Sequence, residues 1–258
     1  MEQKTAQQQQ QQQQFIVYLE PRGQFHDILH RFMQESALVA RNSAHDYEMI
    51  HCTLTSFFSI SNVDGSSDGR GDGGNDNGEI NVDRATQAYV KAIESAVSQV
   101  RSETTEGTSC CSLTRFQFKQ LPYTMKFMFE SQWLVRCVQL FTETVNKLRM
   151  DHDAEPEIST DKTRKLHISL AYGEQYRNNM ELLREMLDRM VLNQTTFTDL
   201  LSRMEHQEEM WRIVMYERRR RLESEPNIQS ESSSSSFTWR EIVSIDLPIR
   251  ILVDNEAN

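Results

Sequence analysis

Two short motifs carry histidine and hydroxyl side chains in the same order, 116 residues apart along the chain. Both have a histidine, an apolar residue, a hydroxyl residue and a second apolar residue. Histidine exchanges a proton near neutral pH more readily than any other side chain. A hydroxyl can donate a hydrogen bond to a charged phosphate oxygen. The motifs are His51-Cys52-Thr53-Leu54 and His167-Ile168-Ser169-Leu170.

Each motif lies in a segment that is predicted to be a β-strand, at 50–58 and at 165–172. Successive side chains on a strand point to opposite faces, so the histidine and the hydroxyl of one motif share a face while the apolar residues pack behind them. If the two strands lie side by side, two imidazoles and two hydroxyls meet in one cleft. The predicted catalytic residues are His51, Thr53, His167 and Ser169.

A pair of histidines suits the cleavage of a phosphodiester without a metal. One neutral imidazole can take a proton from the attacking water or ribose hydroxyl, and a second, protonated imidazole can give a proton to the departing oxygen. The two hydroxyls can stabilise the charge on the phosphate oxygens. Both histidines are expected to titrate near their usual pKa and to give a bell-shaped pH–rate profile, and the sequence does not assign the acid and the base.

No cofactor and no metal are expected. His26 and His30 have the helical spacing of a metal-binding pair, but no set of acidic residues completes a site. The four cysteines likewise lack the paired spacing of metal ligands, and they suit a reducing compartment. No apolar stretch approaches the length of a membrane helix and the first residues are polar, so we expect a cytoplasmic or nuclear protein.

Apolar periodicity predicts the elements that hold the two motifs in place. Further strands are expected at 15–19, in a hairpin at 114–129, and at 210–217 and 237–247, with helices at 24–40, 83–100, 131–149 and 179–192. This order favours an α+β fold of two similar lobes, each a small antiparallel sheet backed by helices, with a cleft between them.

Two segments are too polar to join a core. Residues 1–14 form a glutamine-rich tail, and 61–78 hold six of the nine glycines. Both are expected to be disordered, because such compositions bury too little apolar surface to offset the entropy of ordering. A single bilobal domain over 15–253 remains, with 61–78 as an insertion.

The net charge of −10 argues against non-specific binding to long DNA or RNA, which depends on neutralising many phosphates. It leaves room for a small phosphorylated ligand in one local pocket. The expected partner is therefore a small ribonucleotide or an RNA end, bound by a monomer that does not associate with membranes.

The two motifs resemble the paired His-x-Thr/Ser signatures of the 2H phosphoesterase superfamily, which includes RNA ligase-like and cyclic phosphodiesterase enzymes. The segments 165–172 and 210–216 look most like the phosphoesterase domain of ubiquitin-associated/SH3 phosphatase proteins. The resemblance spans about 15–253 and implies a bilobal fold with pseudo-twofold symmetry. It also implies 2′,3′-cyclic phosphates and 2′,5′- or 3′,5′-linked oligoribonucleotides as substrates, cleaved by the four motif residues.

The motifs lie farther apart than in compact members of that superfamily. The segments 61–78 and 102–112 account for the excess, because long surface insertions cost little stability. The alternative to an enzyme is a catalytically weak module that binds RNA ends or nucleotides in the same cleft. Tyr172, two residues beyond the second motif, is a candidate to stack on a nucleobase, although the sequence favours a packing role.

Overall fold

The computed structural model describes residues 14–47, 49–59, 77–103, 111–149, 166–192, 208–220 and 237–251. The strands are β1 (Gln14–Pro21), β2 (Cys52–Thr53), β3 (Phe58–Ser59), β4 (Ser112–Leu121), β5 (Thr124–Glu130), β6 (Leu166–Tyr172), β7 (Glu208–Arg220) and β8 (Phe237–Ile251). The helices are α1 (Gly23–Ala40), a short 3₁₀ turn η1 (Ser43–Asp46), α2 (Asn77–Glu103), α3 (Gln132–Arg149), α4 (Glu174–Asn178) and α5 (Met180–Leu192). The segments 1–14 and 61–78, expected to be disordered, lie outside the described residues except at 14 and at 77–78.

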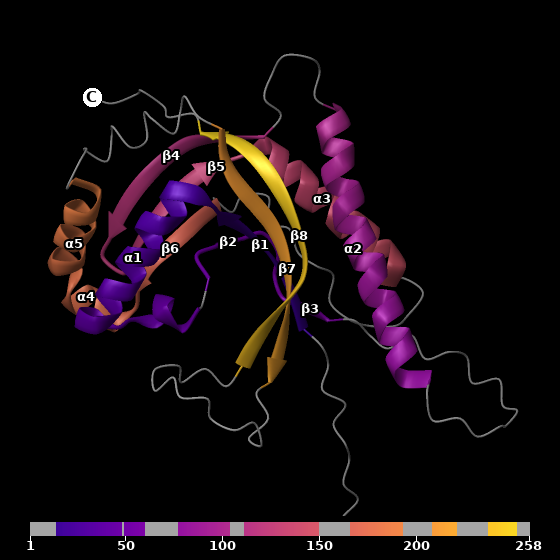
Figure 1. The fold of residues 1–258 in the computed structure, drawn as a ribbon, viewed down its shortest axis with the longest axis horizontal. Coiled ribbons are helices and arrows are strands. Elements are labelled where there is room, and N and C mark those ends of the chain that lie inside the picture. The colour runs from indigo at the N-terminus through magenta and orange to yellow at the C-terminus, as the bar shows by residue number, and fades with distance from the viewer. Residues whose placement is uncertain are drawn as a thin grey trace, which may run out of the picture.

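The eight strands of the described residues form one sheet in the order β2-β6-β5-β4-β8-β7-β1-β3, and β1 pairs with β2 as well. The pairings lead from β2 through β6, β5, β4, β8 and β7 to β1, and β1 pairs with β2, so the strands form a closed circuit. The pairings are antiparallel except for β4 with β8. The α+β class is confirmed, but the strands join in one strongly curved sheet instead of two separate ones (Figure 1).

Strand β1 pairs with β7, β3 and β2 and is buried on both faces. Phe15, Val17 and Leu19 point into the main core, while Ile16 and Tyr18 point into a smaller cluster on the opposite face. This double burial explains why the segment is a continuous apolar run, since a strand covered on both sides does not alternate with polar residues.

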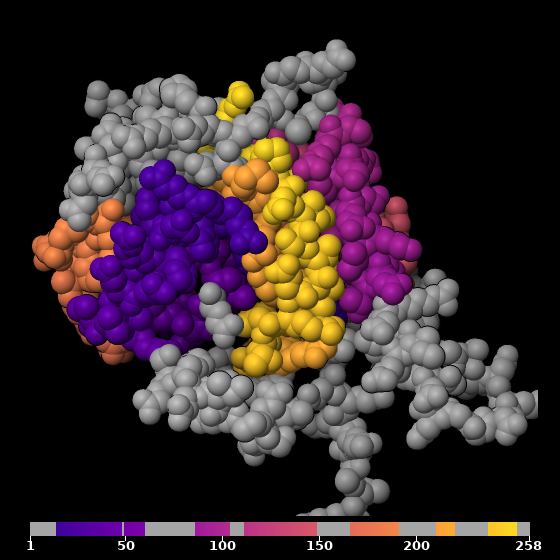
Figure 2. All heavy atoms as spheres, in the orientation of Figure 1, coloured from indigo at the N-terminus to yellow at the C-terminus, as the bar shows by residue number. Residues whose placement is uncertain are grey.

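The helices form two groups at opposite ends of the sheet. Helix α1 packs against α5, and α2 packs against α3. In Figure 1 the first group, with α4, lies at one end of the curved sheet and the second group at the other. Figure 2 shows α1 and the β7–β8 hairpin at the surface on the same side of the molecule. None of the helices among the described residues combines the length and the apolar character needed to cross a lipid bilayer.

The predicted strand at 50–58 is wrong in its extent, because only β2 and β3 at its two ends are strand. Between them, Thr55 is buried and its hydroxyl oxygen accepts a hydrogen bond from the backbone N–H of Val17 at 3.0 Å. The side chain of Thr55 thus takes the place of a backbone group in the ladder beside β1. Helix α2 begins earlier than predicted, whereas the helix predicted at 179–192 is confirmed as α5, with the short α4 before it.

Candidate active site

The structure places the two motifs on neighbouring strands. Strand β2 lies between β1 and β6, and Cys52 faces Ile168 in an antiparallel pair. Continuing this register by one residue in each direction brings His51 opposite Ser169, and Thr53 opposite His167. Cys52 and Ile168 are fully buried, so the four motif residues share the opposite face of the sheet. The four predicted catalytic residues therefore meet as the alternation of strand side chains predicts.

The pairing of the motifs has local twofold symmetry. An antiparallel pair of strands has a twofold axis perpendicular to the sheet at the midpoint of each facing pair. The axis between Cys52 and Ile168 relates His51 to His167, and Thr53 to Ser169. Each histidine therefore faces the hydroxyl of the other motif. The two histidines are diagonal neighbours, about 7–8 Å apart at their Cα atoms.

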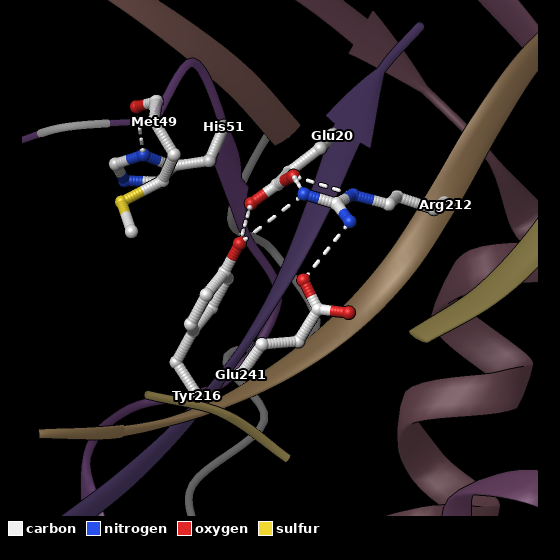
Figure 3. A network of polar contacts seen from close by, with 6 residues as sticks. All are labelled: Glu20, Met49, His51, Arg212, Tyr216 and Glu241. Carbon is white, nitrogen blue, oxygen red and sulfur yellow. Dashed lines mark hydrogen bonds and ion pairs between the residues drawn. The ribbon is translucent and has the colours of Figure 1, made fainter. Parts of the chain in front are cut away.

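The ring of His51 is fixed in orientation. Its Nδ1–H donates to the backbone carbonyl of Met49 at 3.0 Å (Figure 3). The ring centroid lies 3.9 Å from that of Tyr18 and 5.1 Å from that of Tyr47. Because Nδ1 carries the hydrogen of this bond, Nε2 has the free lone pair of the neutral ring.

His51 is neutral at pH 7. Loss of solvent lowers its pKa to about 4, the hydrogen bond to Met49 opposes that effect, and the nearby charge of His167 lowers the pKa further. The expectation that both histidines titrate near their usual pKa is therefore wrong for His51. The charge of His167 therefore reaches His51 across the strand pair.

A polar network that is buried at Glu20 and Tyr216 lies beside His51 (Figure 3). Continuing the β1–β2 register past the pair of Leu19 with Cys52 places Glu20 opposite His51. The carboxylate of Glu20 is buried and accepts from Arg212 at 2.7 Å and from the hydroxyl of Tyr216 at 2.8 Å. Arg212 also donates to Glu241 at 3.0 Å. These bonds compensate the buried charge and hold the backbone on which His51 rests.

Sequence reasoning missed this network, because Glu20 and Arg212 lie 192 residues apart. The one signal in the sequence is a lone carboxylate at the end of an apolar strand, which needs a cationic partner if the strand is buried. The sequence alone does not identify that partner.

Three aromatic side chains form a wall next to His51. Tyr47 and Phe57 are 36% and 40% exposed, and Trp239 is partly exposed. The ring centroids of Phe57 and Trp239 are stacked 6.1 Å apart, and those of Tyr47 and Trp239 are 6.4 Å apart. Exposed aromatic rings beside a phosphate site can stack on a nucleobase. We refer to Tyr47, Phe57 and Trp239 as the aromatic wall.

Tyr172, the residue that the sequence offers as a candidate for stacking, lies near this site but its hydroxyl has another partner. Its hydroxyl donates to the backbone carbonyl of Ser43 at 3.0 Å. Burial, followed by the nearby Tyr47, raises its pKa to about 12. Tyr172 thus supports the turn at 43–46 that leads to Tyr47, and its contact with a substrate stays a prediction.

Among the described residues, no group of three or more His, Cys, Asp or Glu side chains is arranged to hold a metal ion. His26 and His30 lie on α1, and their rings stack on each other with centroids 5.6 Å apart. Nδ1 of His26 lies 3.2 Å from Oδ1 of Asp27. Compared with known proteins, the chain matches no family model and no curated protein. The assignment of a function therefore depends on the residues and geometry described above.

Proposed function

We propose that this protein is a two-histidine phosphodiesterase that hydrolyses 2′,3′-cyclic phosphates or 2′,5′-linked oligoribonucleotides without a metal. The observation that carries this proposal is the facing pair of Cys52 and Ile168, which joins the two motifs in register on one face. Both residues are fully buried, so the reactive side chains project from a rigid apolar base.

In this reaction His51 is the general base, because its ring is neutral and its Nε2 lone pair is available. Nε2 takes a proton from water as the water oxygen forms a bond to phosphorus. His167, as the imidazolium, gives its proton to the departing ribose oxygen as that phosphorus–oxygen bond breaks. A phosphomonoester with a free ribose hydroxyl results, and the two histidines exchange their protonation states before the next turnover.

Thr53 and Ser169 donate hydrogen bonds to the non-bridging phosphate oxygens, where negative charge grows in the transition state. Each hydroxyl faces the histidine of the opposite motif, so the two flank the phosphate from both strands. The aromatic wall beside His51 offers a surface for the nucleobase next to the scissile phosphate.

The same geometry supports a bilobal 2H-type organisation. The axis between β2 and β6 relates β1 and β7 on one side to β5 and β4 on the other. Helices α1 and α5 pack together, as do α2 and α3, so each end of the sheet has a helical cover. We propose that these halves are the two lobes and that the substrate lies between them.

The test is hydrolysis of 2′,3′-cyclic AMP and of 2′,5′-linked triadenylate with EDTA present. We expect turnover by the wild type, and a loss of about 10²–10⁴-fold in kcat in each of His51→Ala and His167→Ala. Thr53→Ala and Ser169→Ala should lose roughly 10–100-fold, the value of one hydrogen bond to a charged group. His30→Ala, an exposed histidine on α1, is the matched control and should keep full activity.

Unchanged turnover in either motif-histidine variant would overturn the assigned mechanism. If the wild type binds both nucleotides but cleaves neither, the chain is a binding module for nucleotides or RNA ends. If it neither binds nor cleaves them, the proposed substrate class is wrong.

A further inference from the structure

A row of facing residues extends from the catalytic face onto the β4–β5 hairpin. Ser169 faces Lys126 across β6 and β5, and Lys126 faces Lys119 across β5 and β4. With His51 opposite Ser169, four strands contribute one residue each to the same row. Side chains that face one another across antiparallel strands lie on the same side of the sheet. Both lysines therefore project from the face that carries the two histidines.

The two lysines form a repulsive pair in the absence of a ligand. Like charges that face each other across a strand pair lower stability. Lys119 is exposed and Lys126 is partly exposed. Among the described residues, no carboxylate lies within ion-pair distance of either ammonium group. Two facing ammonium groups without a counter-charge make a binding site for an anion, and lysine is a common ligand of phosphate.

The twofold axis between the two motifs relates each lysine to a residue in the other half of the sheet, and the two halves differ at these positions. The axis between the motifs relates Lys126 to Tyr18, and Lys119 to Val214, which faces Tyr18 across β1 and β7. Tyr18 and Val214 are buried, 1% and 0% exposed. The scaffold therefore accepts apolar residues at these positions on one side, and the lysines on the other side have no equivalent there. The aromatic wall lies on the side without lysines, around Tyr18 and Trp239.

The spacing suits consecutive phosphates of one nucleotide chain. Neighbouring strands are about 4.8 Å apart, so the Cα of Lys126 lies about 10 Å from that of His51, and that of Lys119 about 14 Å away. The flexible stem of each lysine lets its ammonium group reach back toward the site or outward along the hairpin.

We propose that Lys126 and Lys119 bind a second phosphate of the substrate, so that the preferred substrates are oligoribonucleotides that carry phosphates besides the scissile one. This inference rests on the proposed function and narrows its substrates from single nucleotides to oligoribonucleotides. The aromatic wall then holds the base on one side of the scissile phosphate, and the lysines hold the phosphate backbone on the other side.

The test compares two substrates with the same reactive end. One is 2′,3′-cyclic AMP, which has one phosphate, and the other is triadenylate that ends in a 2′,3′-cyclic phosphate. In Lys119→Gln/Lys126→Gln we expect KM for the triadenylate to rise roughly tenfold or more. Its kcat, and both constants for 2′,3′-cyclic AMP, should stay within twofold. Lys91→Gln/Lys147→Gln is the matched control, since it removes two exposed lysines from α2 and α3.

Salt dependence provides a readout that a structural role of the lysines would not change. Each phosphate contact on a single strand contributes about 0.7 to the slope of log affinity against log salt. The slope for the triadenylate should therefore become shallower by about 0.7 in the double variant, which loses one phosphate contact, and stay unchanged in the control.

The two proposals fail in different ways. If the variant cleaves the triadenylate with wild-type KM and slope, the second phosphate site is wrong and the phosphodiesterase stands. If the wild type cleaves neither substrate, binding of 5′-fluorescein-labelled triadenylate is measured by anisotropy. Binding that weakens in the lysine variant supports the phosphate site and overturns the enzyme, whereas absence of binding overturns both.

Discussion

The two motif histidines share a local sequence pattern but not the same surroundings. His51 is packed between Tyr18 and Tyr47 and donates to the carbonyl of Met49, and its burial there lowers its pKa to about 4. A base that stays neutral in mild acid takes up a proton only at low pH. In the proposed mechanism, the acid limb of the pH profile therefore belongs to His51.

We expect the acid limb of kcat/KM for 2′,3′-cyclic AMP to fall with a midpoint near pH 4. The reason is that protonation of His51 removes the lone pair that accepts the proton of water. Initial rates between about pH 3.5 and pH 8 measure this. A midpoint near the ordinary histidine value of about 6.5 would show that His51 is not the base or that it is fully solvated.

The same low pKa makes stability depend on pH. In the unfolded chain the histidine has its ordinary pKa of 6.5, so the stability that the neutral ring contributes is complete above pH 6.5. It is lost as the pH falls through about 4, a change on the order of 3 kcal/mol. We expect urea unfolding at pH 7 and pH 4 to show this loss in the wild type and a smaller loss in His51→Gln.

The pair of Glu20 and Arg212 gives another expectation at this scale. Arg212→Met leaves the buried carboxylate of Glu20 without its cation and should lower the free energy of unfolding by about 3–5 kcal/mol. The double variant Glu20→Gln/Arg212→Met should recover part of the loss. Urea unfolding of the three proteins measures both effects. Equal stability of Arg212→Met and the wild type would show that the pair contributes nothing.

Among the elements, the junction between β1 and β2 depends on one side chain. Thr55→Val keeps the shape of Thr55 but removes the acceptor of the Val17 N–H, so it should cost about 1–3 kcal/mol. Thr55→Ser keeps the hydroxyl and should cost less. Both values come from urea unfolding, and a Val variant as stable as the Ser variant would contradict the role of the hydroxyl.

Most elements could be predicted from sequence, because their apolar patterns are local. In the hairpin of β4 and β5, strand β5 alternates buried and partly buried residues, and α1 repeats apolar residues at helical spacing. The division of 50–58 into β2 and β3 could not be predicted, since it depends on the contact of Thr55 with a strand 38 residues away.

The candidate site likewise has some features that follow from local sequence rules and others that depend on contacts between distant segments. The shared face of His51 and Thr53 follows from strand alternation, which is a local rule. The register of Cys52 with Ile168 joins segments 116 residues apart and depends on how the whole sheet is assembled. The aromatic wall combines three separate segments, and no local pattern marks its members.

At the scale of the molecule, the circuit of paired strands closes through the two residues of β2. A strand this short contributes few ladder bonds, so local opening at β2 should require less free energy than opening of β7, which is paired along its length. In native-state hydrogen exchange we expect the amide of Leu54, bonded to Val17, to exchange faster than the amide of Val214. Equal protection of the two would show that β2 opens only with the whole fold.

The twofold axis between β2 and β6 has a consequence for regiochemistry. Turning a phosphodiester half a turn about this axis exchanges His51 with His167 and presents the phosphorus to the same kinds of groups. The four reactive residues alone therefore cannot decide which ester oxygen departs. The departing oxygen must instead be selected by features that the axis does not relate to each other. These are the desolvated ring of His51 with the aromatic wall on one side, and the facing lysines on the other. If the proposed function holds, we expect substitutions in the aromatic wall or at the facing lysines to change which bond is cleaved while the four motif residues stay in place.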